Sequence, residues 1–141
     1  MVLSISQAAL VYAFDIDNGK VTINDYIGND VNVRCTSIEI PRALMGRKRE
    51  IYPVIAIGKT DSRFPWYAVN QIIIPEGVKY ILPYAFEYMD GLISAELPDS
   101  LESIGEGAFK DCSRLKKLVI PETIKSIGTN AFHDSIEIEY R

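Results

Sequence analysis

The last half of the chain repeats one pattern of residues at a constant spacing. Pro75, Pro98 and Pro121 are each 23 residues apart. The same spacing separates two further sets of identical residues: Ile81, Ile104 and Ile127, and Phe86, Phe109 and Phe132. Because equivalent positions recur in register, each copy is expected to adopt one local structure and to stack on the next, as in a solenoid. A scaffold of this kind predicts a shape, but it does not name a ligand.

One copy, SRLKKLVIPETIKSIGTNAF (113–132), shows what a single coil is expected to contain. Leu115, Leu118 and Ile120 alternate with other positions, as in a short strand with one buried face, and the following proline ends that strand. Gly128 allows the backbone to turn or to approach its neighbour closely. The Ala-Phe pair that follows is expected to close the coil as a helical turn or a second short strand. Stacked coils bury their open faces and pair strands about 4.8 Å apart.

The spacing LxxLxIPxxIxxIGxxAF, close over residues 69–132, resembles the BspA-type leucine-rich repeat of host-associated bacterial surface proteins and some protozoan proteins. This resemblance implies a right-handed arc with a parallel sheet on its concave side. It also implies proteins that bind other proteins or host matrix rather than catalyse reactions. The expected fold class is therefore α/β: a strand-rich, right-handed leucine-rich-repeat solenoid with an amino-terminal antiparallel β cap.

Upstream of the regular copies, the pattern becomes irregular. Residues 38–71 resemble a degenerate first repeat, in which Ile38, Ile40 and Pro41 form the strand and Ile57 and Gly58 form the later pair. The distance from the proline of this repeat to the next one is 34 residues instead of 23, which indicates an insertion of about eleven residues. The basic residues of that insertion are interpreted as a solvated loop, because an acidic residue follows them and the chain is acidic overall.

The first residues predict antiparallel strands instead of a repeat. Asn18 and Gly19 form a strong signal for a two-residue hairpin, which would pair residue 16 with 21 and residue 14 with 23. Because a stack leaves an apolar end, residues 1–37 are interpreted as a cap. The expected single domain is then residues 1–37 as cap, 38–71 as first repeat, 72–94, 95–117 and 118–135 as repeats, and 136–141 as a charged closing strand.

Composition limits the classes of partner. The net charge of −4 gives no general attraction to nucleic acid or to an anionic membrane. The longest early apolar run, AALVYAF, is too short to insert into a bilayer, and the acidic residues after it do not fit a signal peptide. We therefore expect neither nucleic acid binding nor membrane insertion. Both a cytoplasmic protein and a secreted or surface domain with a leader outside this chain remain open, although the family resemblance favours the latter.

No residue pattern predicts catalysis, a cofactor or a metal site. His133 is the only histidine and is expected in an exposed loop. Cys112 occupies the repeat position of Met89 and Ser135, so it is interpreted as an inward-facing residue rather than a nucleophile. The carboxylates that follow the repeat prolines should form a column, which more often lines a wet turn than holds a cation: Glu76, Asp99 and Glu122. A second column should alternate in charge and favour the correct register: Lys79, Glu102 and Lys125.

The strand alternation predicts a binding surface on the open side of the sheet. Its candidate residues are Gln71, Ile73, Ser94, Glu96, Lys117 and Val119, which should lie side by side. A rival site is RFPWY, in which Trp66 and Tyr67 either form an exposed contact or plug the irregular junction between the first coils. The mixed character of the first surface suits a protein or glycan ligand, although an ordinary exposed sheet face would look the same.

The leading hypothesis is a noncatalytic interaction module that binds a protein or glycan ligand. The alternative is a structural spacer or assembly domain of a larger surface protein, which presents another domain or self-associates end to end through its terminal strands.

Overall fold

The computed structural model describes residues 5–7, 10–17, 20–28, 37–40, 42–45, 51–58 and 69–141. Regular structure in these residues consists of strands alone, so the α part of the predicted α/β class is wrong for the described chain. The strands are β1 (Ile5–Gln7), β2 (Leu10–Asp17), β3 (Lys20–Gly28), β4 (Ser37–Glu39), β5 (Ala43–Met45), β6 (Ile51–Ile57), β7 (Gln71–Ile73), β8 (Tyr80–Ile81), β9 (Ser94–Glu96), β10 (Ser103–Ile104), β11 (Lys117–Ile120), β12 (Ser126–Ile127) and β13 (Glu137–Tyr140).

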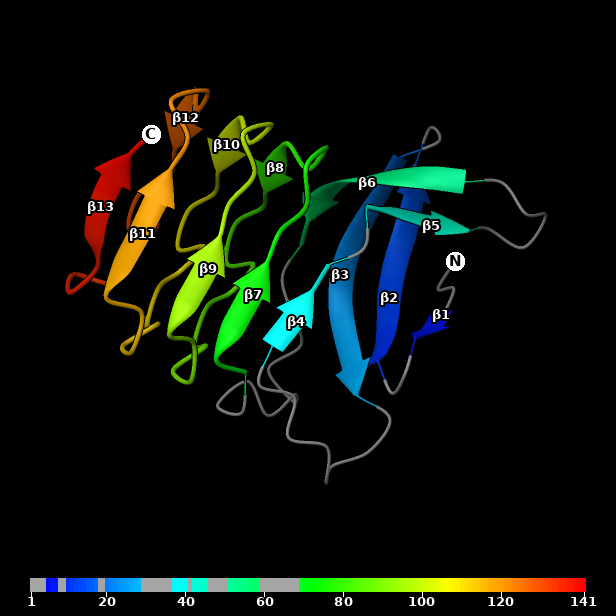
Figure 1. Cartoon of the computed structure of the whole chain (residues 1–141), viewed down its shortest axis with the longest axis horizontal. Helices are drawn as coiled ribbons and strands as arrows, with labels where there is room; N and C mark the ends of the chain where they lie inside the picture. Colours follow the sequence, from blue (N-terminus) through cyan, green and yellow to red (C-terminus); the bar gives the residue numbers. More distant parts are fainter. Residues whose placement is uncertain are drawn as a thin grey trace.

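The front sheet consists of β4, β7, β9, β11 and β13, of which β7, β9 and β11 precede the repeat prolines (Figure 1). All pairings in this sheet are parallel: β4 with β7, β7 with β9, and β11 with β13. The strands β9 and β11 follow each other in the stack, but among the described residues they are not paired in a β-ladder. The front sheet is therefore continuous in arrangement but interrupted in its hydrogen-bond ladder.

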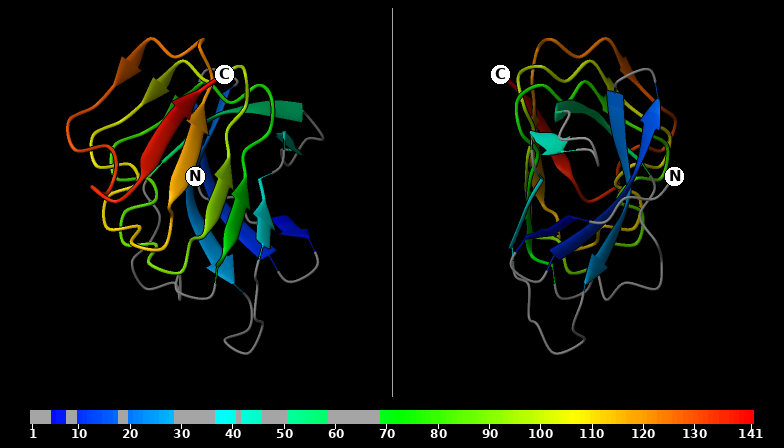
Figure 2. Two further views of the ribbon diagram at one scale, coloured as in Figure 1. Left: turned by 60° about the vertical axis from the view of Figure 1, so that its left-hand side comes forward. Right: turned by 90° about the vertical axis from the view of Figure 1, so that its right-hand side faces the viewer.

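The parallel back sheet on the other side of each coil contains β6, β8, β10 and β12 (Figure 2). Its register aligns four isoleucines: Ile57, Ile81, Ile104 and Ile127. The predicted equivalence of Ile57 with the later repeats is therefore confirmed. The insertion contributes β5, which pairs antiparallel with β6, so part of the expected loop is a strand.

The amino-terminal strands extend the back sheet beyond β6. The strand β3 pairs parallel with β6, and β2 and β1 follow in antiparallel order. The hairpin between β2 and β3 places Ile16 opposite Val21 and Phe14 opposite Ile23, which is the predicted register. The residues Asn18 and Gly19, on which that prediction rested, lie outside the described residues. So do residues 31–36 of the expected third cap strand, and its last residues belong to β4 in the front sheet.

The core lies between the two sheets and repeats from coil to coil. The residues predicted to face inward in the best-preserved copy, Leu115, Leu118 and Ile120, are fully buried. The phenylalanine rings form a continuous stack along the coils, with centroids 5.2 Å apart for Phe86 and Phe109 and 6.2 Å apart for Phe109 and Phe132. A parallel bridge joins the backbones of the last two, so the coil closes as a short strand contact rather than as a helix.

Two repeat positions depend on local backbone geometry, one for its φ angle and one for its closeness to the preceding coil. Tyr84, Gly107 and Asn130 are equivalent in the repeat, and all three adopt positive φ angles of 59°, 60° and 51°. Gly128 is required for a different reason. A side chain at this position would collide with the backbone of Glu106 in the preceding coil. The predicted close approach at this glycine is therefore confirmed, and the glycine position sets the spacing between coils.

Candidate functional site: the open face of the front sheet

The predicted binding residues come from three strands whose alternation separates core from surface. In β11, Leu118 and Ile120 are buried, Lys117 is exposed and Val119 is half-buried. In β7, Ile72 is buried between two half-buried residues. Side chains alternate along a strand, so the predicted outward residues share one surface, which we call the sheet face: Gln71, Ile73, Ser94, Glu96, Lys117 and Val119.

The register brings four of these six residues together directly. Gln71 lies opposite Ser94, and Ile73 lies opposite Glu96. The amide of Gln71 also donates a hydrogen bond of 3.1 Å to the Glu96 carboxylate. The pair from β11 lies across the interruption of the ladder, so backbone pairing does not hold it to the other four. The sheet face therefore has two parts, which meet at the seam between β9 and β11.

The closing strand adds acidic residues that the sequence analysis did not assign to this surface. Glu137 lies opposite Lys117 and Glu139 lies opposite Val119 in the β11 and β13 pair. The ammonium group of Lys117 contacts the Glu139 carboxylate at 2.7 Å, and this hydrogen bond raises the pKa of the lysine. The sequence does carry a signal for this contact, because glutamates alternate with apolar residues after 136. Extending the predicted sheet by that strand would have placed Glu139 beside Lys117.

The rival aromatic site belongs to the segment RFPWY, residues 63–67. Trp66 and Tyr67 lie outside the described residues, so the choice between an exposed contact and a junction plug stays open.

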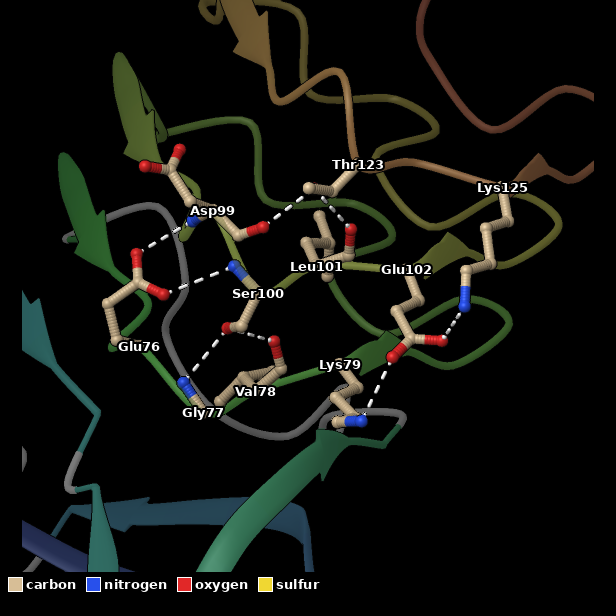
Figure 3. A network of polar contacts seen from close by, with 10 residues as sticks. All are labelled: Glu76, Gly77, Val78, Lys79, Asp99, Ser100, Leu101, Glu102, Thr123 and Lys125. Atoms are coloured by element: carbon tan, nitrogen blue, oxygen red, sulfur yellow. Dashed lines mark hydrogen bonds and ion pairs between the residues drawn. The ribbon is translucent and has the colours of Figure 1, made fainter.

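The column of alternating charge is confirmed on the other side of the coils (Figure 3). The carboxylate of Glu102 lies 3.0 Å from the ammonium group of Lys79 and 2.7 Å from that of Lys125. The hydrogen bonds from Lys125 and then Lys79 lower the pKa of Glu102. Each contact joins neighbouring coils, so the column favours one register, although exposed ion pairs of this kind add little to stability.

The carboxylates after the prolines connect coils instead of converging on a cation. Glu76 accepts hydrogen bonds from the backbone N–H groups of Asp99 at 2.7 Å and Ser100 at 3.1 Å (Figure 3). The bond from Asp99 is the main reason that the pKa of Glu76 is lowered. Asp99 in turn contacts the guanidinium group of Arg141 at 2.8 Å. Among the described residues, no cluster of histidine, cysteine and carboxylate side chains could hold a metal ion.

A hydroxyl column beside these carboxylates was missed by the sequence analysis. Ser100 accepts a hydrogen bond from the Gly77 N–H and donates to the carbonyl of Val78 (Figure 3). Thr123, at the equivalent position one coil later, donates to the carbonyls of Asp99 and Leu101 at 2.6 and 3.1 Å. The signal was available as a serine and a threonine 23 residues apart. These hydroxyls satisfy backbone groups in the preceding coil and so act structurally.

Cys112 and His133, whose side chains could act as a nucleophile or a base, both lie in surroundings that suit a structural role. Cys112 is fully buried, and this burial raises the pKa of its thiol to about 12, so the thiol stays protonated at neutral pH. His133 is half-buried, not fully exposed as expected, and its Nδ1 lies 2.9 Å from the hydroxyl of Ser135. The Ser135 backbone N–H also donates to the same nitrogen at 3.2 Å. This local arrangement caps the turn before the closing strand.

The described part of the chain contains no helix with the length and apolar character needed to cross a membrane.

A comparison with curated proteins found no match. Solved structures of leucine-rich repeat proteins are similar over nearly the whole chain. One from Bacteroides capillosus has a TM-score of 0.80 at 21% identity and covers 98% of both chains.

Two further structures are longer than this chain. A leucine-rich repeat protein from Bacteroides ovatus has a TM-score of 0.75 at 28% identity and covers 95% of this chain, which spans 33% of that protein. A leucine-rich cell surface protein from Faecalibacterium prausnitzii has a TM-score of 0.69 at 21% identity, with 99% of this chain and 43% of that one covered. The family model for the BspA-type leucine-rich repeat region matches residues 60–140 with six copies. The chain therefore belongs to the BspA-type leucine-rich repeat family.

Proposed function

We propose that this chain is a noncatalytic interaction module that binds a protein or glycan ligand on the sheet face. The observation that carries the proposal is the composition of that face. Half-buried aliphatic side chains, Ile73 and Val119, stand beside the exposed charges of Glu96 and Lys117. A surface with a small apolar centre and a charged rim is typical of contact sites between proteins.

The charges on this side of the molecule favour a ligand with basic groups. Glu96, Glu137 and Glu139 are exposed on the strands β9 and β13, whereas Lys117 is the exposed base among the described residues of the front strands. Lys117 is already paired with Glu139, which leaves the other two carboxylates in excess. A protein surface that carries lysine or arginine side chains complements this excess, and such complementarity mainly increases specificity and the rate of association.

A location at the cell surface is part of the same proposal. It is supported by the family and by the Faecalibacterium prausnitzii structure, which is described as a cell surface protein. We also infer that residues 1–37 cap the amino-terminal end of the stack, because β2 and β3 continue the back sheet beyond the first coil. The right-handed winding implied by the family belongs to this proposal as well.

The test is a binding screen of the purified chain against extracellular matrix proteins and glycans. Any ligand found is then measured against a variant in which Ile73, Glu96 and Lys117 are all replaced by Ser. We expect at least tenfold weaker binding with nearly unchanged melting, because these side chains lie outside the core.

A matched control replaces one aliphatic, one acidic and one basic residue on the back of the coils. Ile127, Glu106 and Lys125 are suitable, since all three are exposed and both charged residues have a partner, as their front counterparts do. The control should bind at full strength. Full binding by the front variant and weak binding by the control would place the ligand on the other side.

The structural spacer remains the second candidate, and one observation favours it. The last back strand, β12, and the closing strand, β13, each pair on one side only. Open strand edges are surfaces on which other strands add. No binding to any member of the screen, together with self-association of the chain, would favour the spacer over the ligand-binding module.

A further inference from the structure

The carboxylate of Glu96 lies between aliphatic residues on the sheet face. In the register of β7 and β9, Ile73 lies directly opposite Glu96. Val119 holds the same repeat position in β11, and Figure 1 shows β9 between β7 and β11. Neighbouring strands of a sheet are about 4.8 Å apart. The exposed carboxylate therefore has a half-buried aliphatic residue on the strand at each side.

Glu96 also differs from other glutamates of the coils in the kind of group that it contacts. Glu102 contacts two lysine ammonium groups, and Glu139 contacts that of Lys117. The Glu96 carboxylate instead accepts a hydrogen bond of 3.1 Å at Oε1 from the neutral side-chain amide of Gln71. Among the described residues, its charge is thus held in place by a hydrogen bond and is not neutralised by a cation.

We propose that Ile73, Glu96 and Val119 form a receptor for one lysine side chain of a protein partner. The ammonium group binds the Glu96 carboxylate, and the methylene stem lies along the two aliphatic side chains. Lysine suits this arrangement because its stem packs on apolar surface while its charged head stays near water. This receptor rests on the proposed function, since it names the group of a protein ligand that the sheet face recognises.

The hydrogen bond from Gln71 favours lysine over arginine. A guanidinium group gains its advantage from two parallel hydrogen bonds to both oxygens of a carboxylate. In Glu96, one of these oxygens already accepts the Gln71 amide. An ammonium group needs only the other oxygen, so this hydrogen bond leaves lysine binding intact. Gln71 is thus a positioning residue, which orients the carboxylate.

The first test titrates the isotope-labelled chain with blocked hexalysine and follows the backbone amide signals by NMR. We expect the signals of Ile73, Glu96 and Val119 to shift. Glu96→Gln should weaken binding at least about tenfold, because it removes the charge and keeps the shape of the side chain. Glu122→Gln is the matched control, since it removes an exposed glutamate outside the sheet face. Full binding by Glu96→Gln, or equal loss in both variants, would overturn the proposal.

The second test separates the stem of the lysine from its charge. Blocked hexa(2,4-diaminobutyrate) carries the same number of ammonium groups on shorter stems, and at about pH 6 both peptides are charged and carboxylates are ionised. The native chain should bind this peptide at least about threefold more weakly than hexalysine, because less apolar surface is buried. The preference should disappear in the double variant Ile73→Ser and Val119→Ser. Equal binding of both peptides by the native chain would contradict a receptor for the stem.

The role of Gln71 has its own readout. Gln71→Ala frees the second oxygen of Glu96, so the affinity for hexa-arginine relative to hexalysine should rise above that of the native chain. An unchanged ratio would show that Gln71 does not select lysine.

Ligands from the binding screen distinguish this receptor from the proposed function. A ligand that is lost by the triple variant of Ile73, Glu96 and Lys117, but binds Glu96→Gln at full strength, would overturn the lysine receptor and leave the sheet face as the binding site. A ligand that binds the triple variant at full strength, while hexalysine still depends on Glu96, would count against the proposed function instead.

Discussion

At the scale of single residues, the position of a side chain within the stack decides how much it contributes to the free energy of unfolding. The phenylalanine column shows this clearly, because three identical residues occupy one repeat position with different cover. Phe109 lies between two neighbouring rings and is fully buried, whereas Phe132 has a ring on one side and is partly buried. The same residue type should therefore contribute differently in the two coils.

We expect Phe109→Ala to lower the free energy of unfolding by about 3–5 kcal/mol, because it leaves a cavity between two coils. Phe132→Ala should cost clearly less, since water already reaches part of that ring. Chemical denaturation of both variants measures the difference. Equal costs would contradict the gradient of burial, and a cost below about 1 kcal/mol for Phe109→Ala would place that ring at the surface.

A second residue-scale prediction concerns pH. The pKa of Glu102 is lowered by its hydrogen bonds to Lys125 and Lys79, so the folded state favours the ionised form. The stabilisation is thus present above the unfolded glutamate pKa of about 4.3, and it is lost as the pH falls through the lowered value. Melting temperatures of the native chain should fall more steeply below about pH 5 than those of Glu102→Gln.

The control for this experiment is Glu122→Gln, which removes an exposed carboxylate from the next coil. Its melting should follow the native chain through the acid range. If Glu102→Gln and the native chain lose stability in parallel, the two lysines contribute nothing to the pH dependence.

At the scale of elements, the seam between β9 and β11 is bridged by a side chain from the end of the chain. The guanidinium group of Arg141 donates to the carbonyl of Leu97 at 2.6 Å and to the carboxylate of Asp99 at 2.8 Å. The backbone N–H of the same residue donates to Ile120. One residue thus connects the closing strand to the coils on both sides of the seam.

We expect Arg141→Ala to increase amide hydrogen exchange in β11 and β13 and to destabilise the fold by about 1 kcal/mol, as for other exposed charge contacts. Arg114→Ala removes an exposed arginine from the segment before β11 and serves as the control. Unchanged exchange in β11 and β13 would mean that the bridge does not hold the seam.

Because the repeats are regular, most of the arrangement of the strands and their side chains could be predicted from the sequence. The 23-residue spacing determined which side chains of β7 and β11 face the core, and it placed the charge column at Glu102 correctly. The interrupted ladder was not predictable, because strand alternation specifies the direction of side chains but not the distance between backbones. The absence of a helix in the described residues was also missed, because a short apolar pair such as Ala131 and Phe132 suits either conformation.

At the scale of the whole molecule, stability depends on neighbouring coils rather than on long-range contacts. Neighbouring coils bury their apolar faces against each other, so the loss of one exposes the next. The amino-terminal strands and β13 lie at opposite ends of the stack (Figure 1), and the core is shared along the whole length between them.

Ending the chain after Lys117 should therefore leave the apolar side of the middle coil uncovered. Such a fragment is expected to aggregate or to lose cooperative melting, which calorimetry and light scattering measure. A fragment that melts as sharply as the full chain would show that the coils do not share one core.

The seam between β9 and β11 also determines how the molecule responds to a pulling force. Tension along the stack is carried on the back by the backbone bonds between β10 and β12. On the front at that level no strand ladder carries it, and the two coils are joined by packing, by Arg141 and by the hydroxyl group of Thr123. The front should open first while the back bends like a hinge, and single-molecule extension would record this as a small early step before the coils unravel. A protein held at one end and loaded at the other would therefore yield at a defined place.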